Sequence, residues 1–267
     1  MSSLLQRGIK VLELLAGHPE GVALSAIASA TDMPLSATHL LLAELLSVGY
    51  VRQLREQGDY VLTIKLVSLG LAFLSASGMV DVAQPLLDAL AEESRELVRL
   101  AIVDGDDLVF VAKSQVATRG LRYDPDMGLS VRLSCSAAGH ALLSTMSDEQ
   151  ALQRVARQGF GDPKDFGPRA PTSVKALLAH VRSARKLGYS AIFEVFAPGM
   201  SAMAAPVRLP NGPAIGVVTI AGPMVRLTQA RMLELAPSLM ATAQEVMAAS
   251  KSSTLFARTR RSAKAAR

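Results

Sequence analysis

The segment 33–50 constrains the fold of this chain more than any other. It reads MPLSATHLLLAELLSVGY, so that a proline precedes an apolar repeat of helical spacing and a glycine follows it. At about 100° per residue, the packing face and the opposite face can be assigned. The packing face carries Thr38, Leu41, Leu42 and Leu45, and the opposite face carries Ser36, Leu40, Ala43 and Ser47. The segment predicts a helix that packs on one side and leaves the other side open to a partner.

Two helices are expected before this segment and a β-hairpin after it. The first helix is indicated by apolar residues at helical spacing, namely Leu5, Ile9, Leu12 and Ala16. A short second helix at about 25–30 ends before the turn at 31–34. A hairpin follows the third helix, with its turn at 56–59 (EQGD). Three helices and a hairpin are typical of a winged helix-turn-helix DNA-binding domain.

The whole chain resembles the IclR family of bacterial transcription regulators. The resemblance depends on the order and spacing of short segments, which are 6–15, 34–36, 45–51, 60–63, 69–70, 138–139, 186–189, 198–199, 204–207 and 222–223. It implies a mainly α N-terminal winged helix-turn-helix domain, a linker helix, and an α+β GAF-like C-terminal domain that binds a small effector. It also implies homodimers or homotetramers that bind double-stranded DNA operators.

The apolar pattern supports the same division. A helical repeat at 65–90 is interrupted at 75–78 (SASG), where we place the domain boundary. From residue 99 the period is two, with a hairpin at 100–111. Further strands are expected at 120–123, 129–133, 190–196, 200–208 and 214–221, and helices at 137–145, 148–158, 172–187 and 228–249. We therefore expect DNA binding by 1–75, effector binding and oligomerisation by 80–250 through an antiparallel sheet with packed helices, and a basic, disordered tail at 251–267.

The net charge of +5 does not by itself indicate a basic DNA-binding domain. The tail at 251–267 holds six basic side chains and no acid, whereas residues 1–75 hold one more acidic than basic side chain. Non-specific DNA affinity comes mainly from basic side chains that displace counterions. Arg7, Lys10, Arg52 and Arg55 are the candidate phosphate contacts, with ordinary surface charge as the alternative. The tail either adds phosphate contacts or is an inert extension.

The third helix departs from the family pattern. Leu35 and Leu40 stand where relatives commonly carry lysine and arginine, so the helix lacks the cation that makes a bidentate contact with guanine. Leu40 can instead touch thymine methyl groups, while Ser36 and His39 supply hydrogen bonds. These residues predict an operator rich in A·T pairs. The alternatives are that Leu40 packs on a neighbouring element or partner chain and that His39 is a cap or surface residue.

The resemblance also implies positions for the effector site. These are Leu121, Val131, Ala137, Ala138, Ile192, Ala202, Thr219 and Ala221. Where members that bind small oxo-acids hold an aspartate, a cysteine and a second serine, this chain has Ile192, Ala202 and Ala221. A small charged ligand would leave polar groups unpaired, at about 1–3 kcal/mol each. We therefore expect an apolar or aromatic effector.

Three charged residues keep an aromatic acid open as the effector. A strand that continues through 196 would place Glu194 on the same face as Ile192. Arg122 and Arg132 would engage a carboxylate if their side chains reached the site. For all three residues, surface exposure or an ordinary salt bridge is the alternative.

The sequence gives little support for catalysis or for a cofactor. Cys135 and His140 lack an evident third group to orient the base, so we expect Cys135 to be a small buried hydrophobe and His140 to be exposed. The four histidines are scattered, no zinc spacing or phosphate loop occurs, and no metal is expected. The single cysteine, the lack of a signal peptide and the lack of a membrane span lead us to expect a cytoplasmic protein.

These observations predict a sequence-specific DNA-binding transcriptional regulator whose operator binding is modulated by a small effector. The alternative is a small-molecule binding or adaptor protein that has lost useful DNA affinity.

Overall fold

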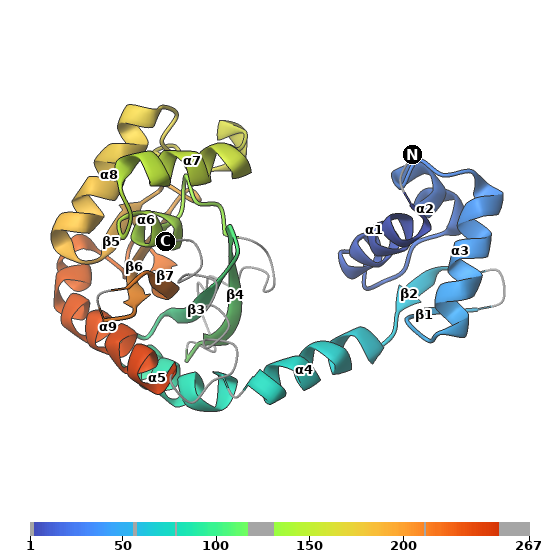
Figure 1. Cartoon of the computed structure of the whole chain (residues 1–267), viewed down its shortest axis with the longest axis horizontal. Helices are drawn as coiled ribbons and strands as arrows, with labels where there is room; N and C mark the ends of the chain where they lie inside the picture. Colours follow the sequence, from blue (N-terminus) through green and yellow to red (C-terminus); the bar gives the residue numbers. More distant parts are fainter. Residues whose placement is uncertain (1–2, 56–57, 78, 117–130, 211, 251–267) are drawn as a thin grey trace. The chain divides into compact units, whose positions relative to one another are not determined.

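The computed structural model describes residues 3–55, 58–77, 79–116, 131–210 and 212–250 (Figure 1). The chain divides into two compact units, an N-terminal unit (Met1–Ala76) and a C-terminal unit (Ser77–Arg267). Each unit has its own architecture. Among the described residues, no helix combines the length and the apolar character needed to cross a bilayer.

The N-terminal unit contains three helices, a hairpin and most of a fourth helix (Figure 1). These elements are α1 (Leu4–Ala16), α2 (Leu24–Ala30), α3 (Leu35–Ser47), β1 (Val51–Gln53), β2 (Tyr60–Leu62) and α4 (Lys65–Ser77). Pro34 is the N-cap of α3, and Gly49, with φ of 75°, follows its C-terminus and leads into β1. This order confirms the predicted helix-turn-helix and hairpin.

The core of the N-terminal unit is formed by one face of each helix. Its buried apolar residues are Val11, Leu15, Ile27, Met33, Leu41, Leu42, Val51 and Tyr60. The helix indicated by the spacing of Leu5 and Ile9 is present, although these two side chains are 74% and 46% exposed. The buried face of α1 holds Gly8, Val11 and Leu15.

The C-terminal unit is an antiparallel sheet with helices on both faces (Figure 1). Its elements are α5 (Met79–Ser94), β3 (Leu97–Asp104), β4 (Asp107–Ser114), α6 (Ala137–Leu143), α7 (Asp148–Gln158), a 3-10 turn (Pro163–Asp165), α8 (Val174–Leu187), β5 (Ser190–Phe193), β6 (Met200–Arg208), β7 (Ala214–Pro223) and α9 (Gln229–Ala249). The strand order is β4-β3-β7-β6-β5. Helices α5 and α9 contact one another and cover one face, while α6 and α8 contact one another and cover the other. This arrangement confirms the α+β fold class.

Two of the expected strands differ from the structure. Residues 131–133 are not a strand, although the Val131 amide donates to the Leu108 carbonyl oxygen at 2.7 Å. The strand expected at 120–123 and residues 129–130 lie outside the described residues. β5 ends at Phe193, because Glu194 adopts the left-handed region with φ of 53° and turns the chain. The alternation assumed for Glu194 therefore does not apply.

The remaining helices and strands lie close to their expected positions. α7 has the expected bounds, since Ser147 caps it and forms a capping box with Gln150. α8 begins after its cap Ser173, and α9 begins after its cap Thr228. Side-chain caps thus mark the helix starts that the sequence pattern gave only approximately.

Candidate functional site

The outward face of α3 is open, as the sequence predicted. Leu40 is 69% exposed and Leu35 is 54% exposed, and Ser36 and His39 are also exposed. Thr38 is buried, and its hydroxyl donates to the Pro34 carbonyl oxygen at 3.0 Å. Within the described part of the N-terminal unit, therefore, Leu40 is not covered by a neighbouring element.

Basic side chains flank this face on other elements. Lys10 on α1, Arg52 on β1 and Arg55 after β1 are exposed, whereas Arg7 is half-buried and takes part in further interactions. Arg7 is the least available of the four predicted phosphate contacts.

Lys65 joins the start of α4 to the end of α3 and was not assigned a role from the sequence. Its Nζ donates to the Val48 carbonyl oxygen at 2.6 Å and lies 4.9 Å from the centroid of the Tyr50 ring. This contact connects the start of α4 to the segment between α3 and β1. Lys65 is one of the few basic side chains of the N-terminal unit.

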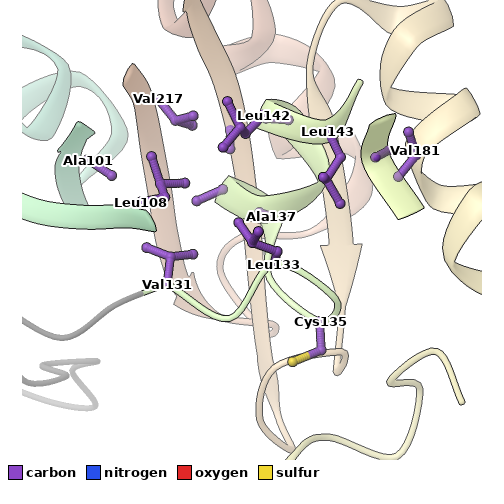
Figure 2. Packing of buried hydrophobic residues seen from close by; sticks show 14 of the residues in the cluster. Ala101, Leu108, Val131, Leu133, Cys135, Ala137, Leu142, Leu143, Val181 and Val217 are labelled. Carbon is purple, nitrogen blue, oxygen red and sulfur yellow. The ribbon is translucent and has the colours of Figure 1, made fainter. Parts of the chain in front are cut away.

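The predicted effector positions on α6 are enclosed. Ala137 and Ala138 are buried, and Ser136 caps α6 by accepting a hydrogen bond from the Gly139 amide at 3.0 Å. A Cβ at Gly139 would collide with the backbone of Leu133, so this helix packs unusually closely on the preceding segment. Figure 2 shows Val131 and Ala137 in the same apolar cluster as Leu133.

The sheet positions of the predicted effector site share one face. In the register, Thr219 pairs with Ala204, Ala202 pairs with Ala221, and Ile192 pairs with Ala202. Ile192, Thr219 and Ala221 are buried and Ala202 is half-buried. Because paired residues point to the same side of a sheet, these side chains lie on the face that α6 covers. Leu121 lies outside the described residues.

The charged residues considered for an acidic effector have other contacts. The Glu194 carboxylate accepts a hydrogen bond from the Gly199 amide at 3.1 Å and lies 4.0 Å from Nε of Arg169. Arg132 donates to the Gln158 and Gly159 carbonyl oxygens at 3.1 and 3.4 Å. Both side chains thus hold turns of the C-terminal unit. Arg122 lies outside the described residues.

Arg99 is a buried basic side chain to which no role was assigned from the sequence. It is only 8% exposed, it pairs with Thr219 across β3 and β7, and its guanidinium carbon lies 3.6 Å from the centroid of the Phe110 ring. Buried arginines are rare unless they are paired. The available signal was one basic residue within the otherwise apolar run of β3, LVRLAIVD.

His140 was expected to be exposed, and this prediction was wrong. The side chain is fully buried because every residue of α6 is enclosed. Nε2 lies 2.8 Å from the Ser134 carbonyl oxygen, so Nε2 carries the proton, since a carbonyl only accepts. The ring stacks on His180 with centroids 4.8 Å apart. Burial lowers the pKa of His140 to about 4.

Cys135 is buried, as expected. Burial is the largest cause that raises the pKa of its thiol, to about 12. A thiol of such high pKa is protonated near neutral pH and is a poor nucleophile. Over the described residues, no group of three or more His, Cys, Asp or Glu side chains is placed to hold a metal ion.

A helix with an exposed face beside a β-hairpin places the N-terminal unit in the winged helix-turn-helix class of DNA-binding domains. Residues 4–55 match the IclR helix-turn-helix domain, and residues 71–248 match the family described as Bacterial transcriptional regulator IclR C-terminal. The chain therefore belongs to the IclR family of bacterial transcriptional regulators, as the resemblance predicted.

Individual relatives agree with this assignment. The Transcriptional repressor IclR of Escherichia coli (strain K12) is 31% identical over 243 residues, which cover 91% of this chain and 88% of that protein. A solved transcriptional regulator from Rhodococcus sp. RHA1 has a TM-score of 0.78 at 26% identity and covers 94% of this chain and 99% of its own. An IclR homologue from Microbacterium hydrocarbonoxydans, solved with 4-hydroxybenzoate, has a TM-score of 0.74 at 21% identity. The match covers 94% of this chain and 100% of that one.

Proposed function

We propose that this chain is a cytoplasmic regulator that binds a specific DNA operator and changes its affinity when a small effector binds. The observation that carries this proposal is the open face of α3, which presents Leu35, Ser36, His39 and Leu40 next to exposed Arg52 and Arg55. The curated relative of 31% identity is named a repressor, which supports repression as the sign of regulation. In this proposal, residues 1–75 bind DNA and residues 80–250 bind the effector.

The operator is proposed to be rich in A·T pairs at the positions that face α3. This helix contains no lysine or arginine, so it cannot make the bidentate contact with guanine that contributes about 1–3 kcal/mol of discrimination. Leu40 offers an exposed apolar surface that fits the thymine methyl group. Arg52, Arg55 and Lys10 supply phosphate contacts, which position the protein without reading sequence.

The effector is proposed to bind between α6 and the facing side of the sheet, at Val131, Ala137, Ala138, Ile192, Ala202, Thr219 and Ala221. Most of these side chains are small and apolar, which favours an apolar or aromatic body. The Microbacterium homologue was solved with 4-hydroxybenzoate, an aromatic compound, which supports this proposal. Leu121 keeps its proposed place at this site. The place expected for Glu194 has lost its support, because β5 ends at Phe193 and the Glu194 carboxylate accepts a hydrogen bond from the Gly199 amide.

We propose that the working form is a homodimer or homotetramer. Val67, Leu69, Leu71 and Phe73 of α4 are all more than half exposed. Val67 and Leu71 lie on one face of the helix and Leu69 and Phe73 on the opposite face, and exposed apolar faces of this kind mark interaction sites. A second copy of the chain is the occupant that the family resemblance suggests. Sedimentation of the purified chain gives its mass directly, and a monomer at micromolar concentration would contradict this part of the proposal.

The test of DNA recognition is selection of bound fragments from a pool of random duplex DNA. The proposal predicts a recurrent palindromic site with A·T pairs facing α3. A Leu40→Arg variant should shift the selected base toward guanine, while the control variant Glu20→Gln, at an exposed position between α1 and α2, should select the original site. If folded protein enriches no sequence, the chain is instead a small-molecule binding or adaptor protein that has lost useful DNA affinity.

A further inference from the structure

A positive charge and an unsatisfied hydroxyl lie side by side on the face of the sheet that α6 covers. Arg99 and Thr219 are direct cross-strand partners on β3 and β7, and Thr219 is also the partner of Ala204 on β6. Directly opposed residues of an antiparallel pair have Cα atoms about 4.5–5.5 Å apart. The two side chains are therefore within reach of one small group.

The Thr219 hydroxyl supplies an independent sign of a ligand. Thr219 is 3% exposed, and its Oγ1 is buried with no hydrogen-bond partner among the described residues. Buried polar groups in folded proteins nearly always have a partner, so an exception calls for an explanation. A bound acceptor or donor over β7 would satisfy this hydroxyl.

Arg99 supplies the charge that decides the ligand class. Its guanidinium stacks on the Phe110 ring at 3.6 Å and is almost completely removed from water. Arg99 has further interactions as well, and a guanidinium with five N–H donors can serve an anion in addition to them. A planar carboxylate matches the donor geometry of guanidinium.

The neighbouring positions on this face carry small apolar side chains. Ala204 and Ala221 adjoin Thr219, and Ala202 pairs with Ala221 one strand further on. Adjacent strands are about 4.8 Å apart, so a ligand anchored at Arg99 reaches Ala202 with a body of about 10 Å. Ala204 belongs to the same apolar cluster as Ala137 and Val217, which are labelled in Figure 2.

We propose that Arg99 and Thr219 form an acid-binding subsite, so that the effector is a monocarboxylic acid with an apolar body. The carboxylate lies on β3 and β7, and the body extends over Ala204 and Ala221. This inference rests on the proposed function, because it assigns a chemical class to the effector of that site. The sequence left an aromatic acid open with Arg122 or Arg132 as the partner of its carboxylate, and this inference assigns that partner to Arg99 and Thr219 instead.

The test compares carboxylic acids with their neutral amides on the full chain. The probes are acetate and acetamide, benzoate and benzamide, and octanoate and octanamide, and the dissociation constants are measured by calorimetric titration. At least one acid should bind the unmodified chain tenfold or more tightly than its amide. In the Arg99→Met variant, the dissociation constant of that acid should rise at least tenfold, while the dissociation constant of its amide should change less than threefold. Arg99→Lys should retain part of the preference.

Two more variants separate binding from folding. Thr219→Val should weaken the acid about threefold or more, and it should raise the thermal midpoint of the unliganded chain, since it removes a buried hydroxyl without a partner. Arg208→Met removes an exposed arginine at the end of β6 and is the matched control, with no expected change. If Arg99→Met does not fold, Arg99→Lys and Thr219→Val provide the test.

The inference is overturned if no acid binds better than its amide, or if the ratio of acid to amide affinity is the same in the Arg99 variants. The same titrations in the presence of the selected operator test the proposed function separately. Equal binding of acid and amide together with a change in DNA affinity would reject the acid-binding subsite and leave the regulator intact. If an acid binds more tightly than its amide but neither changes the DNA affinity, the acid-binding subsite is supported and the proposed regulatory function is rejected.

Discussion

The buried imidazole of His140 makes the stability of the C-terminal unit depend on pH. In the folded chain, burial lowers its pKa from 6.5 to about 4. The unfolded chain therefore binds this proton first as the pH falls. The stabilisation is complete above pH 6.5, is lost as the pH falls toward 4, and changes no further below that value.

The size of this effect follows from the two pKa values. Each pKa unit corresponds to about 1.4 kcal/mol, so His140 should lower the free energy of unfolding by about 2 kcal/mol between pH 7.5 and pH 5. Burial also lowers the pKa of His180, which adds to the loss in the same direction. The Arg182 and Arg185 side chains lower the pKa of Asp148. Protonation of Asp148 therefore reduces the free energy of unfolding only at a more acidic pH than protonation of the histidines.

The assay is urea denaturation followed by circular dichroism at several pH values, on the unmodified chain and on His140→Gln. Glutamine does not titrate, and its amide N–H can still donate to the Ser134 carbonyl oxygen that His140 contacts. The unmodified chain should lose about 2 kcal/mol more than the variant between pH 7.5 and pH 5. Parallel profiles that differ by less than about 0.5 kcal/mol would refute the assigned burial of the neutral ring. His140→Met gives a second comparison if the glutamine variant is poorly folded.

Three further outcomes are expected. Leu42→Ala should destabilise the N-terminal unit by about 2–5 kcal/mol, since Leu42 is fully buried in its core, whereas Leu46→Ala on the partly exposed side should cost much less; equal effects in thermal unfolding would contradict the assigned packing. Gly139→Ala should destabilise the C-terminal unit by about 1–3 kcal/mol, because its methyl group meets the Leu133 backbone, and an unchanged thermal midpoint would show that α6 can shift. Deletion of 251–267, if the tail contacts phosphates, should lower affinity for all DNA sequences and flatten the salt dependence, and an unchanged slope would make the tail inert.

The sequence predicted best where local chemistry decides the structure. The bounds of α7 follow from a capping box at Ser147 and Gln150. The two faces of α3 follow from helical spacing, and Leu41 and Leu42 are buried while Leu40 is exposed. In these segments the local preference and the tertiary packing agree, so one pattern is enough.

The wrong predictions concern residues whose environment is set by other parts of the chain. The spacing of Leu5 and Ile9 indicated α1 but not its buried face, which holds Val11 and Leu15. The apolar run after Ser190 gave no sign that Glu194 adopts a left-handed conformation and ends β5. Burial of His140 depends on segments that are distant in the sequence, such as β7 (Ala214–Pro223), which contacts α6.

Arg99 shows the same limit at the candidate effector site. Its position in an apolar strand was visible in the sequence, but its partners Phe110 and Thr219 became apparent only from the sheet register. Ile192, Ala202 and Ala221 therefore favoured an apolar or aromatic effector, and an aromatic acid stayed open only through Arg122 and Arg132, without Arg99.

The complete enclosure of α6 has a mechanical consequence. This helix contacts β5, β6, β7 and α8, and none of its residues faces solvent, so it has no open side toward which it can move. Protein interiors are nearly incompressible and transmit strain to their neighbours. A molecule that displaces Ala137 or Ala138 by even a fraction of an ångström must therefore move α8 as well. The stacked rings of His140 on α6 and His180 on α8 are a contact through which that displacement passes from one helix to the other.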